Sequence, residues 1–281
     1  MTALPLPSVV VPVAHSVAAL DACLASLERT LPSTAHVLVA DHAAGDPLAE
    51  ALARRWCDRS RLDAEYRQAN TALTLSANIS AAIAGGDRDV VLLQADAVTT
   101  PGWLERLAQY SRKQVNIATV CAWSNRGELA SFPRPGEDNP VPDFPDAIAE
   151  AAAAAPWNEY PELPAASGPC VLIRRAALGQ LGALDAQSFD GERAIDDFCR
   201  RAATMGWRNI LCPAAYVVRQ PAVLGIGHVH DDLSVLVSRW PDYQEQVARF
   251  ILSDPLRGLR ERLQARMEEL AKSGPQRDLF R

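Results

Sequence analysis

The sequence lacks several features that would assign it at once to a common class of protein. Its six cysteines are widely spaced and include no C-x-x-C pair, which argues against zinc ribbons and redox motifs. No apolar run approaches the roughly 20 residues that a membrane-spanning helix needs. Basic residues do not predominate, because the formal net charge is −6. We therefore expect no transmembrane segment and no nucleic-acid partner, since binding of phosphates needs a basic surface.

Signals for export are also missing from the first eight residues, which contain neither a basic stretch nor an apolar one. The cysteines are more typical of small buried side chains in a reducing compartment than of a disulfide framework. We expect a cytoplasmic protein, either free or at the periphery of the inner membrane face. The chain has 281 residues, of which 48% are hydrophobic, a length common for one α/β domain and a composition that allows a sizeable core.

Short β-branched runs alternate with helical segments along the first part of the chain. Four runs have the character of buried parallel strands: residues 9–13, 36–40, 90–93 and 117–121. The helical segments between them cover residues 17–30, 47–57, 75–84 and the stretch that begins at Pro101. This alternation predicts βαβ units and a parallel sheet covered on both faces. Ligands bind such sheets at the carboxyl ends of the strands, where Asp41 and Asp96 are expected.

The second part of the chain has a different character. Residues 132–164 are rich in proline and acidic residues, which predicts a surface excursion with one short helix. Its length favours a lid or an insertion on the acceptor side of a site. Further elements are expected at residues 170–173, 175–181, 194–205, 210–213 and 215–219, and helices from 233 onward. The last helix, 257–272, is densely charged, which would allow contact with anionic lipid, but its charges are of both signs and favour a solvated face instead.

Several segments, in order along the chain, resemble the family 2 glycosyltransferases, particularly bacterial polysaccharide and O-antigen enzymes. The most specific is VVLLQADAVTTPGWLERL at residues 90–107. The others are VVVPV (9–13), TVCAWSNRGELASFP (119–133), LPAASGPCVLIRR (163–175), DFCRRAATMGW (197–207) and WPDYQEQVARFILSDPL (240–256). The resemblance covers roughly residues 8–256, nearly the whole chain.

This resemblance implies the GT-A fold, which is α/β and Rossmann-like, with a mixed, mostly parallel sheet and helices on both faces. The expected GT-A domain spans residues 1–232, with a nucleotide-binding half (1–110) and an acceptor half (111–232). A C-terminal helical extension follows at 233–281. The implied activity is inverting transfer from a UDP or dTDP sugar to a hydroxyl of a carbohydrate or other acceptor. It also implies Mg²⁺ or Mn²⁺ as cofactor and a role in polysaccharide biosynthesis.

The resemblance places eight residues at the donor: Pro12, Val13, Asp41, Asn70, Asn78, Gln94, Asp96 and Arg219. An acidic side chain such as Asp41 can accept the N3–H of uracil or thymine. Asp96 takes the metal-binding position of a D-x-D element, because a hard carboxylate can hold Mg²⁺ or Mn²⁺ against the diphosphate. Both aspartates also fit turn or capping positions after strands. For Asn70 and Asn78, an ordinary loop position and an ordinary helix position explain the residues as well as contact with the donor does.

The catalytic base of such enzymes belongs to an acidic motif that is altered here. Ile195 falls on the base position and cannot accept a proton, whereas Asp196 is one residue away and Glu192 three. One residue on a helix is a rotation of about 100°, so Asp196 replaces the base only if the local backbone is shifted. Our hypothesis is that Asp196 deprotonates the acceptor, assisted electrostatically by Asp197. The alternative for Asp197 is a favourable charge at a helix N-terminus.

On the acceptor side, the matched segments indicate Trp123, Ser167 and Gly168. Trp123, together with Trp157 and Tyr160, fits either an aromatic platform for a sugar ring or buried packing.

Three substitutions depart from the family pattern. Gln94 replaces an acidic or amide residue, Ala72 a glycine, and Arg219 a histidine that often lies near the diphosphate or metal. Arginine cannot ligate a metal but can bind a diphosphate through a bidentate fork. His228 and His230, slightly downstream, either supply the missing ligand or are simply solvated.

These departures leave a second function open, that of a catalytically inactive relative that binds nucleotide or assembles with a partner glycosyltransferase. A nucleotidyltransferase is a third reading of the α/β pattern. It predicts a glycine-rich basic loop near the N-terminus, and VPVAHSVAALDA at residues 11–22 has none.

Overall fold

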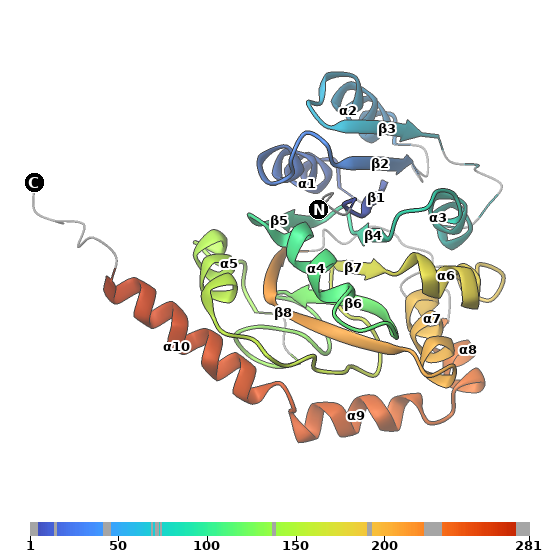
Figure 1. Cartoon of the computed structure of the whole chain (residues 1–281). Coiled ribbons are helices and arrows are strands. Elements are labelled where there is room, and N and C mark those ends of the chain that lie inside the picture. Colours follow the sequence, from blue (N-terminus) through green and yellow to red (C-terminus); the bar gives the residue numbers. More distant parts are fainter. Residues whose placement is uncertain are drawn as a thin grey trace, which may run out of the picture.

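The computed structural model describes residues 5–13, 16–41, 46–68, 70, 73, 75–136, 139–189, 193–221 and 232–273. Within these residues the strands form one mixed sheet in the order β3-β2-β1-β4-β7-β6-β8-β5 (Figure 1). The strands are β1 (Ser8–Val13), β2 (His36–Asp41), β3 (Asp63–Arg67), β4 (Val90–Leu93), β5 (Ala97–Thr99), β6 (Ile117–Trp123), β7 (Cys170–Ile173) and β8 (Arg208–Arg219). The predicted class, α/β with a mixed and mostly parallel sheet, is confirmed.

Helices lie between and after the strands. They are α1 (Val17–Thr30), α2 (Pro47–Arg59), α3 (Leu75–Ala84), α4 (Trp103–Ser111), α5 (Pro145–Ala154), α6 (Arg175–Leu181), α7 (Arg193–Thr204), α8 (Asp232–Arg239), α9 (Tyr243–Ser253) and α10 (Arg257–Ser273). The start of α1 is capped by Ser16, whose hydroxyl accepts a hydrogen bond from the Ala19 N–H at 3.4 Å. Asp46 caps α2 in the same way, and Pro47 occupies its first turn.

The first four strands of the sheet run parallel. β1 pairs with β2 on one side and with β4 on the other, and β2 pairs with β3. The register places Val13 opposite Asp41, so the carboxyl ends of β1 and β2 lie side by side. Helical crossovers between parallel strands produce this arrangement, as the alternating sequence pattern predicts.

The other half of the sheet mixes directions. β7 is antiparallel to both β4 and β6, β6 is parallel to β8, and β5 is antiparallel to β8 at the far edge. β5 belongs by sequence to the predicted nucleotide-binding half (1–110), but it pairs with β8, a strand of the predicted acceptor half. The two halves therefore share one continuous sheet. β8 is a single strand where the sequence indicated two short ones.

Successive side chains of the strands alternate between two apolar clusters, which therefore lie on opposite faces of the sheet. In β4, for example, Val91 and Leu93 belong to one cluster and Val90 to the other. The first cluster includes the buried faces of α1, α2 and α4, and the second those of α3, α6 and α7. Both faces of the sheet are thus covered, which is the layering expected for this class.

A third cluster lies where α5 and α10 meet the far half of the sheet. It contains Ile148 from α5, Tyr216 from β8, and Leu259 and Leu263 from α10, all buried. The one short helix predicted within residues 132–164 is α5, and its buried face belongs to this core. A role of this stretch as a lid or an acceptor-side insertion stays a prediction. Figure 1 shows α8, α9 and α10 in succession along the lower edge of the molecule, from beside α7 to beside α5. None of the described helices combines the length and apolar character needed to span a membrane.

Candidate functional site

A cavity of about 220 Å³ opens at the edge of the sheet where the parallel strands end. Its walls come from the ends of β1, β4 and β8, the loops after β6 and before β7, and the first turn of α7. Polar and small residues among those lining it are Pro12, Gln94, Asp96, Gly127, Glu128, Ser167, Gly168, Arg193, Asp196, Arg219 and Tyr243. Residues from Pro12 to Tyr243, distant in sequence, thus converge at the edge of the sheet where α/β proteins bind ligands.

Of the predicted donor residues, the structure brings four together in this cavity: Pro12, Gln94, Asp96 and Arg219. Val13 is the next residue of β1 after Pro12 and pairs with Asp41. Ser167 and Gly168, expected on the acceptor side, also line the cavity.

Asp96 and Arg219 form an ion pair in the cavity wall. The Arg219 Nε donates to Asp96 Oδ2 at 3.0 Å, and the Asp96 side chain is only 9% exposed. The other carboxylate oxygen, Oδ1, is buried and has no hydrogen-bond partner among the described residues. The main chain reinforces the pair, because the Gln220 N–H donates to the Asp96 carbonyl at 2.8 Å. The residue at the expected metal position is therefore already held by a cation.

Asp41 lies at the same edge of the sheet but outside the residues that line the cavity. Asp96 lies further along the sheet, because it follows the end of β4 by three residues and precedes Ala97, which pairs with Arg219 of β8. The carboxylate is 4% exposed and accepts a hydrogen bond from the Tyr66 hydroxyl. The Arg54 guanidinium stacks over the Tyr66 ring, 4.1 Å from its centroid. Asp41, Tyr66 and Arg54 thus form a side-chain cluster beside the carboxyl end of β2.

Asn70 and Asn78 contact each other. Asn78 accepts a hydrogen bond from the Asn70 N–H at 3.1 Å and donates to the Asn70 carbonyl at 3.2 Å. Neither residue lines the cavity, whereas Ile79, which follows Asn78 in α3, does. Asn78 thus fixes the backbone before α3, and its contact with a donor stays a prediction. Ala72 and Thr74, in the same matched segment, lie outside the described residues.

The first turn of α7 forms the wall that carries the candidate base. The helix begins at Arg193, and both Ile195 and Asp196 line the cavity. The residue on the family's base position is therefore apolar, but its neighbour presents a carboxylate to the same space. Glu192 lies outside the described residues.

Asp196 has the environment of a tuned acid–base group. It is 7% exposed and pairs with Arg193, whose Nη1 lies 2.7 Å from its Oδ2. Burial raises the pKa of Asp196 to about 6, against the opposing effects of Arg193 and of a hydrogen bond with Tyr243. A carboxyl group with a pKa near neutrality can both accept and release a proton at physiological pH.

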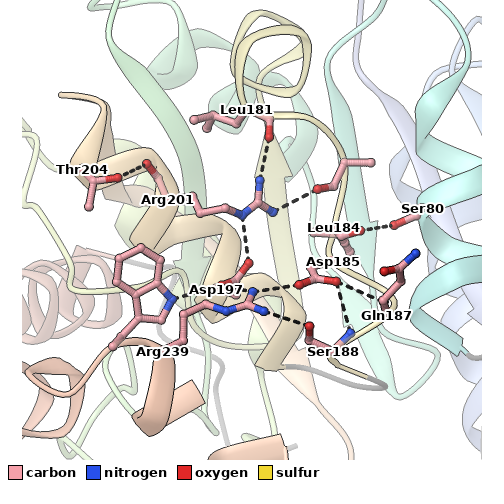
Figure 2. Close-up of polar contacts among 12 residues, drawn as sticks. Ser80, Leu181, Leu184, Asp185, Gln187, Ser188, Asp197, Arg201, Thr204 and Arg239 are labelled. Atoms are coloured by element: carbon pink, nitrogen blue, oxygen red, sulfur yellow. Dashed lines mark hydrogen bonds and ion pairs between the residues drawn. The ribbon is translucent and has the colours of Figure 1, made fainter. Parts of the chain in front are cut away.

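Asp197 has a different setting, which Figure 2 shows. Its carboxylate is completely buried and accepts hydrogen bonds from Arg201 Nε (2.8 Å), Arg239 Nη1 (3.0 Å) and Trp240 Nε1 (3.0 Å). The same arginines hold the segment before α7: Arg201 binds the carbonyls of Leu181 and Ala183, and Arg239 binds Asp185 and Ser188. Asp197 does not line the cavity. We therefore propose a positioning role for Asp197 in place of direct assistance to the base.

Trp123 also differs from its expected role. Its side chain is completely buried at the end of β6, where it packs against Phe132 with ring centroids 6.3 Å apart. A ring with no exposed face cannot stack on a sugar, so in this structure Trp123 belongs to the core. Trp157 and Tyr160 pack beside the sheet, and neither lines the cavity.

Tight backbone packing shapes the acceptor side. Gly168 has φ of +93°, a conformation that favours glycine. A Cβ on Gly127 would lie 3.3 Å from Ser167 Oγ, so a larger residue there would require the Ser167 side chain to shift by a few tenths of an ångström. Ser167 Oγ accepts a hydrogen bond from the Leu129 N–H at 3.3 Å, which joins the two loops.

Three cavity residues with polar side chains were not identified from the sequence: Glu128, Arg193 and Tyr243. Arg193 stands three residues before Asp196, a helical spacing that indicates a pair. Glu128 and Tyr243 belong to matched segments but carry no local signal of their own. Tyr243 comes from α9, so the predicted C-terminal extension contributes to the cavity.

The divalent metal implied by the resemblance fits the described side chains poorly. Among the residues that the structure describes, no group of three or more His, Cys, Asp or Glu side chains is placed to hold a metal. Asp96 is the one carboxylate at the expected position, and one of its oxygens is paired with Arg219. A cation bound there would lie beside a guanidinium of like charge. His228 and His230, considered as additional ligands, lie outside the described residues.

Solved structures with a similar fold include a mannosyltransferase. The mannosyltransferase PcManGT of Pyrobaculum calidifontis, in complex with GDP-Man and Mn²⁺, has a TM-score of 0.61 at 17% identity, over 98% of this chain and 77% of that one. GalNAc-T7 with UDP, GalNAc and Mn²⁺ gives 0.64 at 15% identity, over 95% of this chain and 57% of that one. S. aureus TarS 1–349 gives 0.51 at 14% identity, over 95% and 91%. At these identities the likeness shows the GT-A fold alone.

Sequence comparison points the same way. No curated protein matches the chain significantly. Residues 8–182, well over half of the chain, match the family described as Glycosyl transferase family 2. With the sheet topology and the cavity at its carboxyl edge, this match shows that the chain belongs to glycosyl transferase family 2.

Proposed function

We propose that this chain transfers a sugar from a nucleoside diphosphate sugar to an acceptor hydroxyl, with inversion at the anomeric carbon. The observation that carries the proposal is the position of Asp196, a buried carboxyl group with a raised pKa, in the same cavity as Asp96 and Arg219. A single base facing a single donor site supports direct displacement, which inverts configuration.

In the proposed reaction the Asp196 carboxylate accepts the proton of the acceptor hydroxyl as that oxygen attacks the anomeric carbon. The bond between the anomeric carbon and the diphosphate oxygen breaks, and the diphosphate leaves with the electron pair. Arg193 and Tyr243 hold the Asp196 carboxylate in place. A positioned general base typically contributes about 10²–10⁴-fold to the rate.

We propose UDP or dTDP as the nucleotide of the donor. Asp41 can accept the N3–H of a pyrimidine, and Tyr66 orients its carboxylate. Pro12 lines the cavity and the next residue, Val13, pairs with Asp41, so we propose that the base extends from the cavity past the end of β1 toward Asp41. Because a divalent metal fits the described side chains poorly, no step of this proposal passes through one.

We also propose a cellular compartment and an acceptor class. All six cysteines are free and most are buried, which supports a reducing, cytoplasmic compartment. We propose a carbohydrate acceptor and a role in polysaccharide biosynthesis from the segments that resemble such enzymes.

The proposal is tested by calorimetry followed by turnover assays on the full chain. We expect UDP or dTDP to bind more tightly than GDP, and at least one corresponding nucleotide sugar to release its diphosphate in the presence of acceptor sugars. Asp196→Asn should lower turnover by about 10²–10⁴-fold. The matched control is Asp146→Asn, because Asp146 forms an exposed ion pair with Arg29 far from the cavity. Equal turnover in both variants would remove Asp196 from the mechanism.

A second function has one observation in its favour. Ile195 occupies the family's base position and lines the cavity, so the usual proton acceptor is absent. On this proposal the chain binds nucleotide without turnover and acts as a partner of an active glycosyltransferase. This second function predicts that the chain binds the donor but transfers no sugar from any nucleotide sugar. It also predicts that Asp196→Asn leaves donor binding unchanged.

A further inference from the structure

The last residue of β8 is fixed at the cavity by contacts on its main chain and its side chain. The Arg219 N–H donates to Asn125 Oδ1 at 2.7 Å, and Asn125 Nδ2 donates back to the Arg219 carbonyl at 3.0 Å. Asn125 is itself 1% exposed and donates to the Asn139 carbonyl at 3.3 Å. The guanidinium donates to Asp96 at 3.0 Å. Arg219 is therefore a positioned cation and not a mobile surface side chain.

The negative charge of Asp96 is balanced by a guanidinium, whereas at a metal site it would be balanced by the metal ion. A divalent cation such as Mg²⁺ binds through one or two carboxylates together with phosphate oxygens and water. Of the three carboxylates that line the cavity, Asp196 is paired with Arg193, and no group of three potential ligands forms among the described residues. Asp96 has one oxygen, Oδ1, without a hydrogen-bond partner among them, but a cation bound there would lie beside the Arg219 guanidinium that holds Oδ2, and like charges repel strongly where solvent is excluded.

We propose that Arg219 binds the diphosphate of the donor in place of a divalent metal, and that Asp96 acts as the positioning residue that orients it. This proposal rests on the proposed function, because it assumes that a nucleoside diphosphate occupies the cavity. A guanidinium presents a planar set of donors that matches phosphate oxygens and keeps its charge at every physiological pH. Arg219 also stabilises the diphosphate as it leaves, because negative charge develops there when the glycosidic bond breaks.

The first test needs no variant. UDP binding to the full chain is measured by calorimetry in EDTA and again with excess Mn²⁺, and we expect dissociation constants within about threefold of each other. Binding that needs Mn²⁺ by tenfold or more overturns the inference but leaves the proposed function standing. The absence of binding by UDP and dTDP under both conditions overturns both proposals.

The second test compares three variants in EDTA. Arg219→Gln should weaken UDP binding by about tenfold to a hundredfold, as expected for loss of a charge-assisted contact with phosphate. Asp96→Asn should weaken it less, because the guanidinium remains and a negative charge near the diphosphate is removed. The matched control is Arg208→Gln: Arg208 begins the same strand and pairs with Glu162 at 2.9 Å, away from the cavity.

The order of these effects separates the proposal from its alternatives. A metal held by Asp96 predicts the reverse order, with Asp96→Asn the more damaging variant and an effect that appears only with Mn²⁺. A merely structural ion pair predicts equal losses in both variants, because each removes the same contact. Either result overturns the inference. Thermal unfolding of each variant shows whether it is folded. If Arg219→Gln is not folded, Arg219→Lys takes its place: we expect its loss of UDP affinity to exceed that of Asp96→Asn, and the reverse order overturns the inference.

Discussion

At the scale of single residues, Asp196 is held between opposing influences. Burial penalises its charged form, whereas the Arg193 guanidinium and the hydrogen bond with Tyr243 favour it. Glu128, on the facing loop, adds a small effect in the same direction as burial. Burial prevails, so the pKa of Asp196 is raised to about 6 instead of being lowered as in an exposed ion pair.

This balance predicts how the rate depends on pH. A general base acts when it is deprotonated, so turnover should rise with pH and level off above the pKa of Asp196, about 6. Initial rates of diphosphate release between about pH 5 and pH 8 measure this inflection. A rate that falls over this range would mean that Asp196 acts as an acid or does not act at all.

Tyr243 provides the control for this assignment. Its hydrogen bond lowers the pKa of Asp196, so Tyr243→Phe should move the inflection to higher pH. Tyr160→Phe is the matched substitution outside the cavity, since Tyr160 packs against Tyr110 with ring centroids 5.6 Å apart. An identical shift in both variants would show that the inflection reports global stability and not Asp196.

At the scale of elements, the buried carboxylate of Asp197 joins α7 to α8 and to the segment before α7. Arg201 and Arg239 reach it from opposite sides, and Trp240 adds a third hydrogen bond (Figure 2). The segment that these arginines hold includes Leu184, which lines the cavity. Asp197 thus sets the position of the wall on which Asp196 acts.

Removal of this charge should be costly. Asp197→Asn leaves two arginines without their shared partner, and loss of one member of a buried ion pair typically costs about 3–5 kcal/mol. Urea unfolding followed by circular dichroism measures the change in free energy. The matched control is Asp242→Asn, because Asp242 pairs with Arg200 but is 54% exposed, and such pairs contribute about 0–1 kcal/mol. Similar losses in the two variants would contradict the proposed role of Asp197.

The elements also show how far sequence patterns predict this fold. Helices with a clear apolar spacing, such as residues 17–30 and 257–272, are found within one residue of where they were predicted. β3 was missed because its sequence DAEYR has no apolar run, as befits an edge strand whose residues are exposed or half-buried. β5 was missed because it is only three residues long. Both depend on pairing with a neighbouring strand more than on local preference.

The candidate site was predictable to the extent that its residues follow strands. Asp96 and Arg219 come directly at strand ends, and topology brings such ends together. Glu128 and Tyr243 reach the cavity from a loop and from a helix near the end of the chain. Their proximity arises from tertiary packing, which no spacing in the sequence encodes. The same holds for Trp123, whose burial follows from its neighbours and not from its type.

At the scale of the whole molecule, the C-terminal helices and the glycosyltransferase domain are packed as one structure. α9 supplies Tyr243 to the cavity, and α10 buries Leu259 and Leu263 against the cluster that contains α5 and β8. The helix α5 comes from the excursion of residues 132–164. This excursion and the C-terminal extension, which the sequence set apart, therefore share one apolar core.

A shared core predicts that damage to α10 will lower stability without altering the site. Leu263→Ala removes a completely buried side chain and should cost about 2–5 kcal/mol, because it leaves a cavity between α10 and α5. The matched control is Leu252→Ala, whose side chain is 86% exposed and whose loss should change stability by less than about 0.5 kcal/mol. The affinity for UDP, measured at a temperature where both variants are folded, should equal that of the unaltered chain, because no residue of α10 lines the cavity. A Leu263→Ala variant with weaker UDP binding and unchanged stability would contradict this prediction. In that case α10 would have to act on the cavity through α9 and Tyr243, and the third cluster would contribute to ligand binding as well as to stability.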